Sequence, residues 1–288
     1  MSAALRLRRL LRVSLVTAAL AQLTEFYRQA FGCTLLARNE ATGGADGAAR
    51  RAVLALGAEC IELLEFEPRG APYPAGLAAS NPRFQHCAVV VADMAAAYAQ
   101  LARLPGWQPI SRDGPQRLPA NTGHVSAFKF RDPDGHPLEL LAFAPGAVPQ
   151  RWQRPPRDVL FLGIDHSAIS VTDSARSIDF YTELGLEVSA STHNRGPEQA
   201  RLDGLDAPEV SVTALALPDG GPHVELLCYA GAAVSAPAAL AANDVAATRL
   251  VFEGSARRSL TDPDGHHLSS RPESAHFRTD SDAAWSGS

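Results

Sequence analysis

The stretch of residues 128–143, FKFRDPDGHPLELLAF, is typical of two β-strands joined by a tight turn. Phenylalanines alternate with charged residues at its start, as in a strand with one buried face. The following Asp-Pro-Asp-Gly (132–135) predicts a β-turn, because proline presets φ and glycine accepts a positive φ. The second strand carries one carboxylate, Glu139, between two leucines. A charge in an apolar strand needs solvent or a compensating partner, so Glu139 is a candidate site residue.

Several segments of the chain repeat. The turn recurs in residues 260–270, LTDPDGHHLSS, and residues 84–93 and 164–173 share the pattern His-x-Ala-(Val/Ile)-x-Val-x-Asp. This pattern predicts an alternating strand that ends at an N-capping aspartate. Helices are expected to follow at Met94–Leu104 and Ser174–Leu184. Such repetition indicates that the chain contains several copies of one structural unit.

A further copy at the start of the chain has a helix that ends at Gly32. When its Phe-Tyr pair is aligned with that of the third copy, Arg12 falls opposite His166. A fourth copy is shortened, because no helix follows its first strand (Ala247–Phe252) and Ser269 replaces the glutamate. The prediction is therefore an α+β chain of four β-α-β-β-β modules, the fourth truncated and lacking its helix, near residues 8–68, 82–145, 160–231 and 244–271.

The composition fits a globular protein of two domains, 1–150 and 157–272, followed by a flexible tail over 273–288. Of the 288 residues, 46% are hydrophobic and 20% charged, and the net charge is −5 without a basic block, which argues against nucleic acid. No stretch reaches the about 20 apolar residues that cross a bilayer. Four cysteines without a CxxC pair indicate a reduced, cytoplasmic protein. We expect a monomer or homodimer that acts on a small molecule.

The His-containing strand, the Asp-capped helix with Phe-Tyr, the glycine stop and the ending DPDGHPLEL (132–140) resemble the vicinal oxygen chelate superfamily. That family includes glyoxalase I, extradiol dioxygenases, fosfomycin-resistance enzymes and bleomycin-binding proteins. The resemblance covers nearly all of residues 8–271. It implies that modules pair into two cupped mixed sheets, with a divalent metal held inside a cup by the first and last strands of each module. Because the fold hosts several chemistries, the resemblance defines the reaction less closely than the fold.

The ligand positions implied by the resemblance are filled unevenly. They fall on His86 and Glu139 in module two and on His166 and Glu225 in module three. Module one keeps Glu62 but has Arg12 in place of the histidine, and module four keeps neither ligand.

The pairing of the modules decides what these residues form. If module one pairs with two and module three with four, the first cup holds Glu62, His86 and Glu139 beside an arginine, and the second holds only His166 and Glu225. If module two pairs with module three, as in monomeric two-domain glyoxalases, one cup collects the two-His, two-Glu set of glyoxalase I. The other cup is then metal-free, and Arg12 can pair with Glu62. We favour this second arrangement, because it explains with a single assumption why modules two and three keep both ligands while modules one and four have lost them in part or entirely.

Imidazole and carboxylate ligands with open positions suit Ni, Co, Fe, Mn or Zn. The leading hypothesis is one divalent metal and a glyoxalase-I-like lyase or isomerase, in which Glu139 or Glu225 moves a proton of a small oxygenated substrate that chelates the metal. The alternative is a metal-free small-molecule-binding protein of the bleomycin-resistance type, which the incomplete modules favour. An extradiol ring-cleavage dioxygenase is the third hypothesis, although that family draws two ligands from module four.

Two polar stretches, 112–124 and 193–201, precede inner strands and are expected to line the pockets. Their amide and guanidinium donors suit a carboxylate or carbonyl oxygen of a substrate. The candidate substrate-binding residues are Arg117, Asn121, Asn194, Arg195 and Gln199. Structural or solvated roles are expected for His124, His136, His223, His266, Glu59, Glu65 and Glu67.

Overall fold

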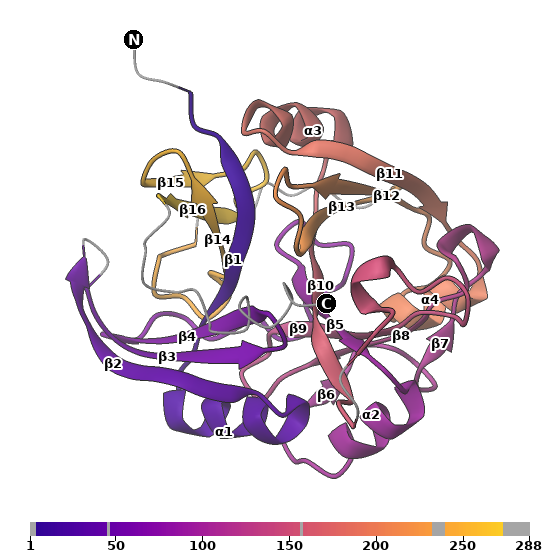
Figure 1. Cartoon of the computed structure of the whole chain (residues 1–288), viewed down its shortest axis with the longest axis horizontal. Coiled ribbons are helices and arrows are strands. Elements are labelled where there is room, and N and C mark those ends of the chain that lie inside the picture. Colours follow the sequence, from indigo (N-terminus) through magenta and orange to yellow (C-terminus); the bar gives the residue numbers. More distant parts are fainter. Residues whose placement is uncertain (1–3, 45–46, 156–157, 232–239, 273–288) are drawn as a thin grey trace, which may run out of the picture.

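The computed structural model describes residues 4–44, 47–155, 158–231 and 240–272, which fold into two mixed β-sheets with short helices (Figure 1). The predicted tail over 273–288 lies outside the described residues. The α+β architecture predicted from the repeats is confirmed. Within the described ranges, no helix combines the length and apolar character needed to span a bilayer.

The first sheet joins modules one and four. Its strand order is β15 (Arg258–Thr261), β16 (His267–Arg271), β14 (Arg249–Gly254), β1 (Leu7–Val16), β4 (Glu59–Glu67), β3 (Gly47–Leu56) and β2 (Thr34–Gly44). The first strands of the two modules, β1 and β14, are antiparallel neighbours with Arg12 opposite Val251. Residues from opposite ends of the chain therefore share one sheet.

The second sheet joins modules two and three. Its order is β11 (Glu187–Asn194), β12 (Val210–Ala216), β13 (His223–Tyr229), β10 (Phe161–Ser170), β5 (Gln85–Val91), β9 (Pro137–Ala142), β8 (Ser126–Arg131) and β6 (Gln108–Pro109), with β7 (Gln116–Arg117) also paired to β8. The antiparallel pairing of β5 with β10 is the arrangement favoured from the sequence. The expected domains 1–150 and 157–272 each contribute one module to each sheet.

The helices begin where the repeat pattern predicts. Asp93 and Asp173 cap α2 (Met94–Leu101) and α3 (Ser174–Glu183), because each side chain accepts a backbone N–H of the first turn. Both helices end slightly before the predicted boundaries. The first helix, α1 (Leu20–Phe31), ends at Gly32, whose φ is 67°. No helix separates β14 from β15, as predicted, whereas the short helix α4 (Pro197–Asp203) was not predicted. The described residues also form the 3-10 turns η1 (Ala120–Thr122) and η2 (Gln150–Trp152).

Each Asp-Pro-Asp-Gly turn is fixed to the helix of the preceding module. Asp132 accepts backbone N–H groups of its own turn, including that of His136 at 2.9 Å, and also the hydroxyl of Tyr27 at 3.0 Å. Asp262 in the second turn accepts the hydroxyl of Tyr181 at 3.1 Å. Modules one and two, and modules three and four, thus pack through helix and turn, while modules one and four, and modules two and three, share sheets.

The largest hydrophobic cluster unites all four modules. The ring centroid of Phe31 in α1 lies 6.3 Å from that of Phe130 in module two and 5.6 Å from that of Phe161 in module three. Phe252 of module four is also fully buried in this cluster. Burial of these apolar side chains is the main force that holds the sheets together.

Two glutamates expected at the surface are buried instead. Glu59 accepts the N–H of Ile164 at 3.0 Å and pairs with Arg151. Glu65 pairs with Arg50 at 2.7 Å. The prediction was wrong because the partners come from other strands and from a distant segment, which the local pattern does not reveal. Glu67, which was also expected at the surface, is exposed.

Candidate metal centre and ligand cavity

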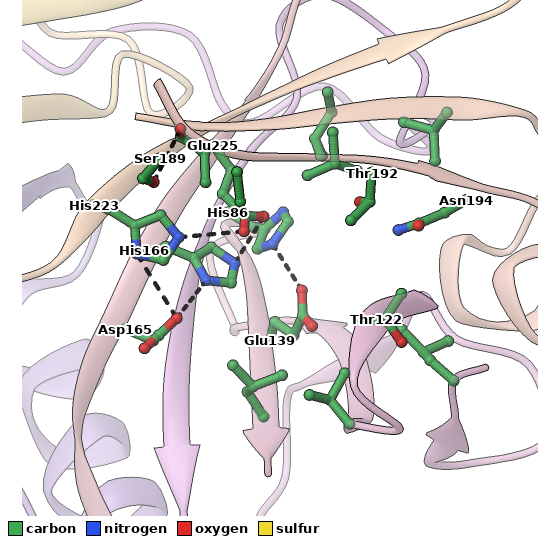
Figure 2. A pocket seen from close by; sticks show the side chains of 18 of the residues that line it. His86, Thr122, Glu139, Asp165, His166, Ser189, Thr192, Asn194, His223 and Glu225 are labelled. Atoms are coloured by element: carbon green, nitrogen blue, oxygen red, sulfur yellow. Dashed lines mark hydrogen bonds and ion pairs between the residues drawn. The ribbon is translucent and has the colours of Figure 1, made fainter. Parts of the chain in front are cut away.

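Two histidines face each other across the shared sheet. His86 lies on β5 and His166 on β10, and the antiparallel register places His86 opposite Ala168 and His166 opposite Ala88. Because side chains two positions apart share a strand face, both imidazoles project into the same cup. Their ring centroids are 5.6 Å apart (Figure 2).

The two expected glutamates lie on the strands that flank the histidines. Glu139 is on β9, which pairs in parallel with β5, and Glu225 is on β13, which pairs in parallel with β10. His86 Nε2 lies 2.7 Å from Glu139 Oε2, and His166 Nε2 lies 3.5 Å from Glu225 Oε2. The four residues proposed from the sequence therefore converge on four adjacent strands.

The environment of His86 fits a metal ligand. Its side chain is 2% exposed, and the close contact with Glu139 is not aligned as a hydrogen bond. Both ring nitrogens therefore lack an aligned partner among the described residues. Burial lowers the pKa of His86, and the Lys129 ammonium lowers it further. A neutral, buried imidazole with unused nitrogens is the form of histidine that binds metals.

His166 is oriented by a neighbouring carboxylate. Its Nδ1 lies 3.1 Å from Asp165 Oδ2, and Asp165 Oδ1 accepts the indole N–H of Trp152 at 3.1 Å. Although burial opposes it, Glu225 and Asp165 raise the pKa of His166 to about 9. The Asp165 contact leaves Nε2 directed at Glu225. A carboxylate behind a histidine in this way is the usual support of a metal-binding imidazole.

His223 is a site residue that the sequence reasoning missed. Its Nε2 lies 3.3 Å from Glu225 Oε1, and its ring centroid is 5.2 Å from that of His166. We expected a structural histidine there. The available signal was its position, because residues 223 and 225 share one face of β13. Figure 2 shows His223 beside His166 and Asp165.

Lys129, the only lysine in the sequence, was also missed. Its Nζ lies 2.7 Å from Asp203 Oδ1 and 4.0 Å from Glu139 Oε2. Burial opposes the charged form, but Asp203 and Glu139 raise the pKa of Lys129 above its ordinary value. Asp203 also accepts hydrogen bonds from the amide of Gln199 and from the hydroxyl of Tyr229. Little in the sequence indicated this role. In an alternating strand, a charged residue between two core phenylalanines is expected to face solvent.

These side chains line one end of a cavity of about 550 Å³. Asn121, Asn194 and Gln199 also line it, and the amide of Asn121 donates to Asn194 Oδ1 at 2.9 Å. Their binding of a substrate stays a prediction. Arg117 and Arg195 are exposed and are not among the lining residues. Figure 2 shows Asn194 on the side of the cavity away from the histidines.

The cavity has an excess of negative charge. Lys129 is shared between Asp203 and Glu139, and the other partners of Glu139, Glu225 and Asp165 among the described residues that line the cavity are histidines. Burial works against ionisation, but Lys129 and the adjacent imidazole hold the pKa of Glu139 below its usual range. His166 and the neighbouring His223 likewise lower the pKa of Glu225 to about 2, again against burial. Buried carboxylates of this kind require a cation.

The spacing of the ligand atoms suits a single ion. One nitrogen or oxygen atom from each of His86, Glu139 and His166 lies within 4.8 Å of the others. Asp165, His166 and His223 form a second such group that shares His166. Metal–ligand bonds of about 2.0–2.2 Å require ligand atoms at roughly this separation.

The fold and site define a class of proteins in which paired β-α-β-β-β modules enclose a small-molecule cavity with ligands suited to a metal. The chain belongs to the Glyoxalase/Bleomycin resistance protein/Dioxygenase superfamily, whose family model matches residues 9–140 and 163–253. The resemblance inferred from the motifs is thereby confirmed. No curated protein matches the sequence significantly.

Solved structures share the fold at low sequence identity. Glyoxalase I from Zea mays is 17% identical, with a TM-score of 0.60 and coverage of 92% of both chains. A candidate dioxygenase from Bacillus subtilis is 13% identical, with a TM-score of 0.55 and coverage of 96% of this chain and 89% of that chain. At these identities the likeness establishes the two-sheet architecture and leaves the reaction to be argued from the site.

Proposed function

We propose that this protein is a metal-dependent enzyme of the glyoxalase I type, a lyase or isomerase that acts on a small oxygenated molecule. The supporting observation is the convergence of His86, Glu139, His166 and Glu225 at one end of a negatively charged cavity. These four side chains would hold one divalent ion, with Ni, Co, Fe, Mn and Zn all compatible with imidazole and carboxylate ligands.

A bound divalent ion supplies Lewis-acid polarisation of two neighbouring substrate oxygens. The protein residues provide the remaining functions. Glu225 has a side chain that is 21% exposed, whereas that of Glu139 is 7% exposed and lies beside Lys129. We therefore assign to Glu225 the transfer of the substrate proton and to Glu139 a fixed position in the site.

The opposite side of the cavity provides substrate contacts. The amides of Asn121 and Asn194 are joined there by a hydrogen bond, and they offer donors and acceptors to a carbonyl or carboxylate oxygen. Apolar side chains such as Leu118, Leu141 and Val212 complete the wall. They exclude water from the reacting atoms, which strengthens electrostatic interactions within the cavity.

A second candidate is a metal-free protein that binds a small molecule. Lys129 already partly neutralises Glu139, and Asp165 and Glu225 each have a histidine partner. The cup therefore has internal charge pairs that hold it together without an ion. Tight binding of an organic ligand that a chelator does not affect would favour this function.

The dioxygenase hypothesis has the least support. That family draws two of its ligands from module four, but here the fourth module lies in the other sheet and offers Ser269 at the equivalent position. The likeness to the Bacillus subtilis structure concerns the fold alone.

The decisive experiment is metal analysis of protein that has been stripped with a chelator and reconstituted with each candidate ion. We expect one tightly bound ion per chain in the wild type and its loss in His86→Ala and His166→Ala. The matched control is His193→Ala, because the His193 side chain on β11 is 49% exposed and lies outside the cluster. Wild-type protein that retains no ion after reconstitution refutes the proposal.

A further inference from the structure

The other cup, formed by modules one and four, carries an arginine where the cup of modules two and three carries His166. The register pairs Ser14 with Glu62 on β1 and β4, in the same way that Ala168 pairs with Glu225 on β10 and β13. Arg12, two positions before Ser14, therefore occupies the place that His166 holds in the other sheet. The strand register is the same in both cups at this position, but one cup holds a guanidinium there and the other an imidazole.

Two guanidinium groups contact a single carboxylate in this cup, and a third lies near them. Glu62 Oε2 lies 3.3 Å from Arg12 Nε, and Glu62 Oε1 lies 2.5 Å from Arg51 Nε. Arg271 on β16 makes no hydrogen bond or ion pair within the described part of the chain. It nevertheless lies near enough to Glu62, Arg51 and Arg12 to affect their electrostatics. One carboxylate cannot neutralise three cations, so two positive charges remain in excess.

The second carboxylate on this face of the sheet does not remove the excess. Glu253 on β14 pairs with Arg9 at 2.8 Å. Another arginine, Arg249, directs its guanidinium to backbone carbonyls and lies 5.8 Å from the ring centroid of Phe66. Among the described residues, the charge of the Arg12, Arg51 and Arg271 group is therefore balanced only by Glu62.

Several buried donors of this group have no acceptor. The side chains of Arg12 and Arg51 are 11% and 21% exposed. Their contacts with Glu62 are close but not aligned with the Nε–H direction, so these Nε atoms and Arg271 Nε lack a hydrogen-bond partner in the described residues. Ser14 Oγ, on a residue that is 1% exposed, also has none. Buried polar groups normally find partners, so this cluster indicates a missing acceptor.

Burial and mutual repulsion make the arrangement costly without a ligand. Burial lowers the pKa of Arg12, and the charges of Arg271 and Arg51 lower it further, whereas Glu62 opposes this effect. A metal ion would add to the repulsion. An anion with two or three oxygen atoms would instead accept hydrogen bonds from the guanidiniums and from Ser14.

We propose that the cup of modules one and four binds a small molecule through an oxyanion, either a carboxylate or a phosphate group, with Arg12, Arg51, Arg271 and Ser14 as donors. The planar guanidinium fork presents paired N–H groups that match both kinds of oxyanion. This site is separate from the candidate metal centre, and the proposal does not depend on metal binding there.

Isothermal titration calorimetry on chelator-stripped wild-type protein at low salt tests the proposal, with inorganic phosphate and succinate as the two probes. Removal of metal ensures that neither probe binds through an ion in the other cup. We expect saturable binding of at least one probe, and the tighter probe defines the class of ligand. Arg271→Gln, at a partly exposed position near the end of β16, should weaken binding at least tenfold.

The matched control is Arg28→Gln on α1, whose side chain is 52% exposed and which should bind the probe like the wild type. Arg12→Gln provides a second loss of binding, provided that its thermal unfolding and circular dichroism match the wild type. Absence of saturable binding in the wild type overturns the proposal. Equal weakening by Arg28→Gln and Arg271→Gln also overturns it, because that result reports only the general charge of the surface.

Discussion

The imidazole rings of His86 and His166 lie with their centroids 5.6 Å apart, although they belong to different modules. This proximity follows from the antiparallel pairing of β5 with β10, which sets the first strands of modules two and three side by side. Each histidine has the glutamate of its own module on the next strand. The pairing therefore places both complete ligand pairs in one cup and leaves the arginine-substituted module for the other.

Asp165 is predicted to position His166 for metal binding. In Asp165→Ala the imidazole loses its Nδ1 partner, so we expect divalent metal affinity to fall by about 10–100-fold, as for other residues that support a metal ligand. Competition with a chromogenic chelator measures this affinity. Asp165→Asn, whose amide oxygen still accepts from Nδ1–H, should recover part of the loss.

The control for this series is Asp206→Ala, because the side chain of Asp206 is 92% exposed and lies outside the cavity. Its metal affinity should equal that of the wild type. Equal affinities of Asp165→Ala and the wild type would show that Asp165 supports only the fold.

The His136–Asp132 pair is predicted to make stability depend on pH. His136 Nδ1 lies 2.9 Å from Asp132 Oδ2 and Nε2 lies 3.1 Å from the carbonyl of Val245, so both nitrogens donate and the ring is charged. Burial opposes this charge, but Asp132 raises the pKa of His136 above 6.5. The contribution of the pair to stability is therefore fully present below pH about 6.5 and is lost as pH rises through the raised pKa.

Replacement of His136 by Gln should therefore cost more at pH 6 than at pH 9. At pH 6 we expect a loss of about 3 kcal/mol in the free energy of unfolding, since one partner of a buried charged pair is removed. Urea denaturation of wild type and variant at both pH values gives this difference. The same loss at pH 6 and pH 9 would mean that the contact with Asp132 does not raise the pKa of His136 in the folded protein.

The two Asp-Pro-Asp-Gly turns offer a matched pair of glycine substitutions. Gly135 and Gly265 have nearly the same φ, 100° and 98°, so alanine should cost on the order of 1–2 kcal/mol in backbone strain at either position. A Cβ at Gly135 would lie 2.9 Å from Tyr73 Cβ, whereas a Cβ at Gly265 meets no atom within 4 Å.

Thermal and urea unfolding should therefore show that Gly135→Ala is less stable than Gly265→Ala. The difference between the two variants isolates the contact with Tyr73, because the strain at φ is common to both. If the two losses are equal, Tyr73 moves aside without cost and the close approach at Gly135 does not constrain the turn.

Much of the site was accessible from the sequence because its residues belong to a repeated pattern. The alternating strands fix the faces on which His86, Glu139, His166 and Glu225 lie, and the aspartate caps and the glycine stop locate the helices between them. Lys129, His223, Asp165 and Asp203 were missed for a common reason. None of them occupies a ligand position that the modules share. Lys129 and Asp203 acquire their roles from each other across a strand and a helix, and Asp165 and His223 acquire theirs from contacts with the ligand residues His166 and Glu225.

By itself, the sequence determined the modular α+β fold, the turns and the strand faces, because these depend on local periodicity and on the backbone preferences of proline, glycine and aspartate. Only the tertiary structure decided which modules share a sheet. That choice depends on the edge pairing of β5 with β10 and of β1 with β14, together with the burial of one core between the sheets. The same choice created an acidic cup that suits a metal and a basic cup in which several buried donors lack an acceptor among the described residues.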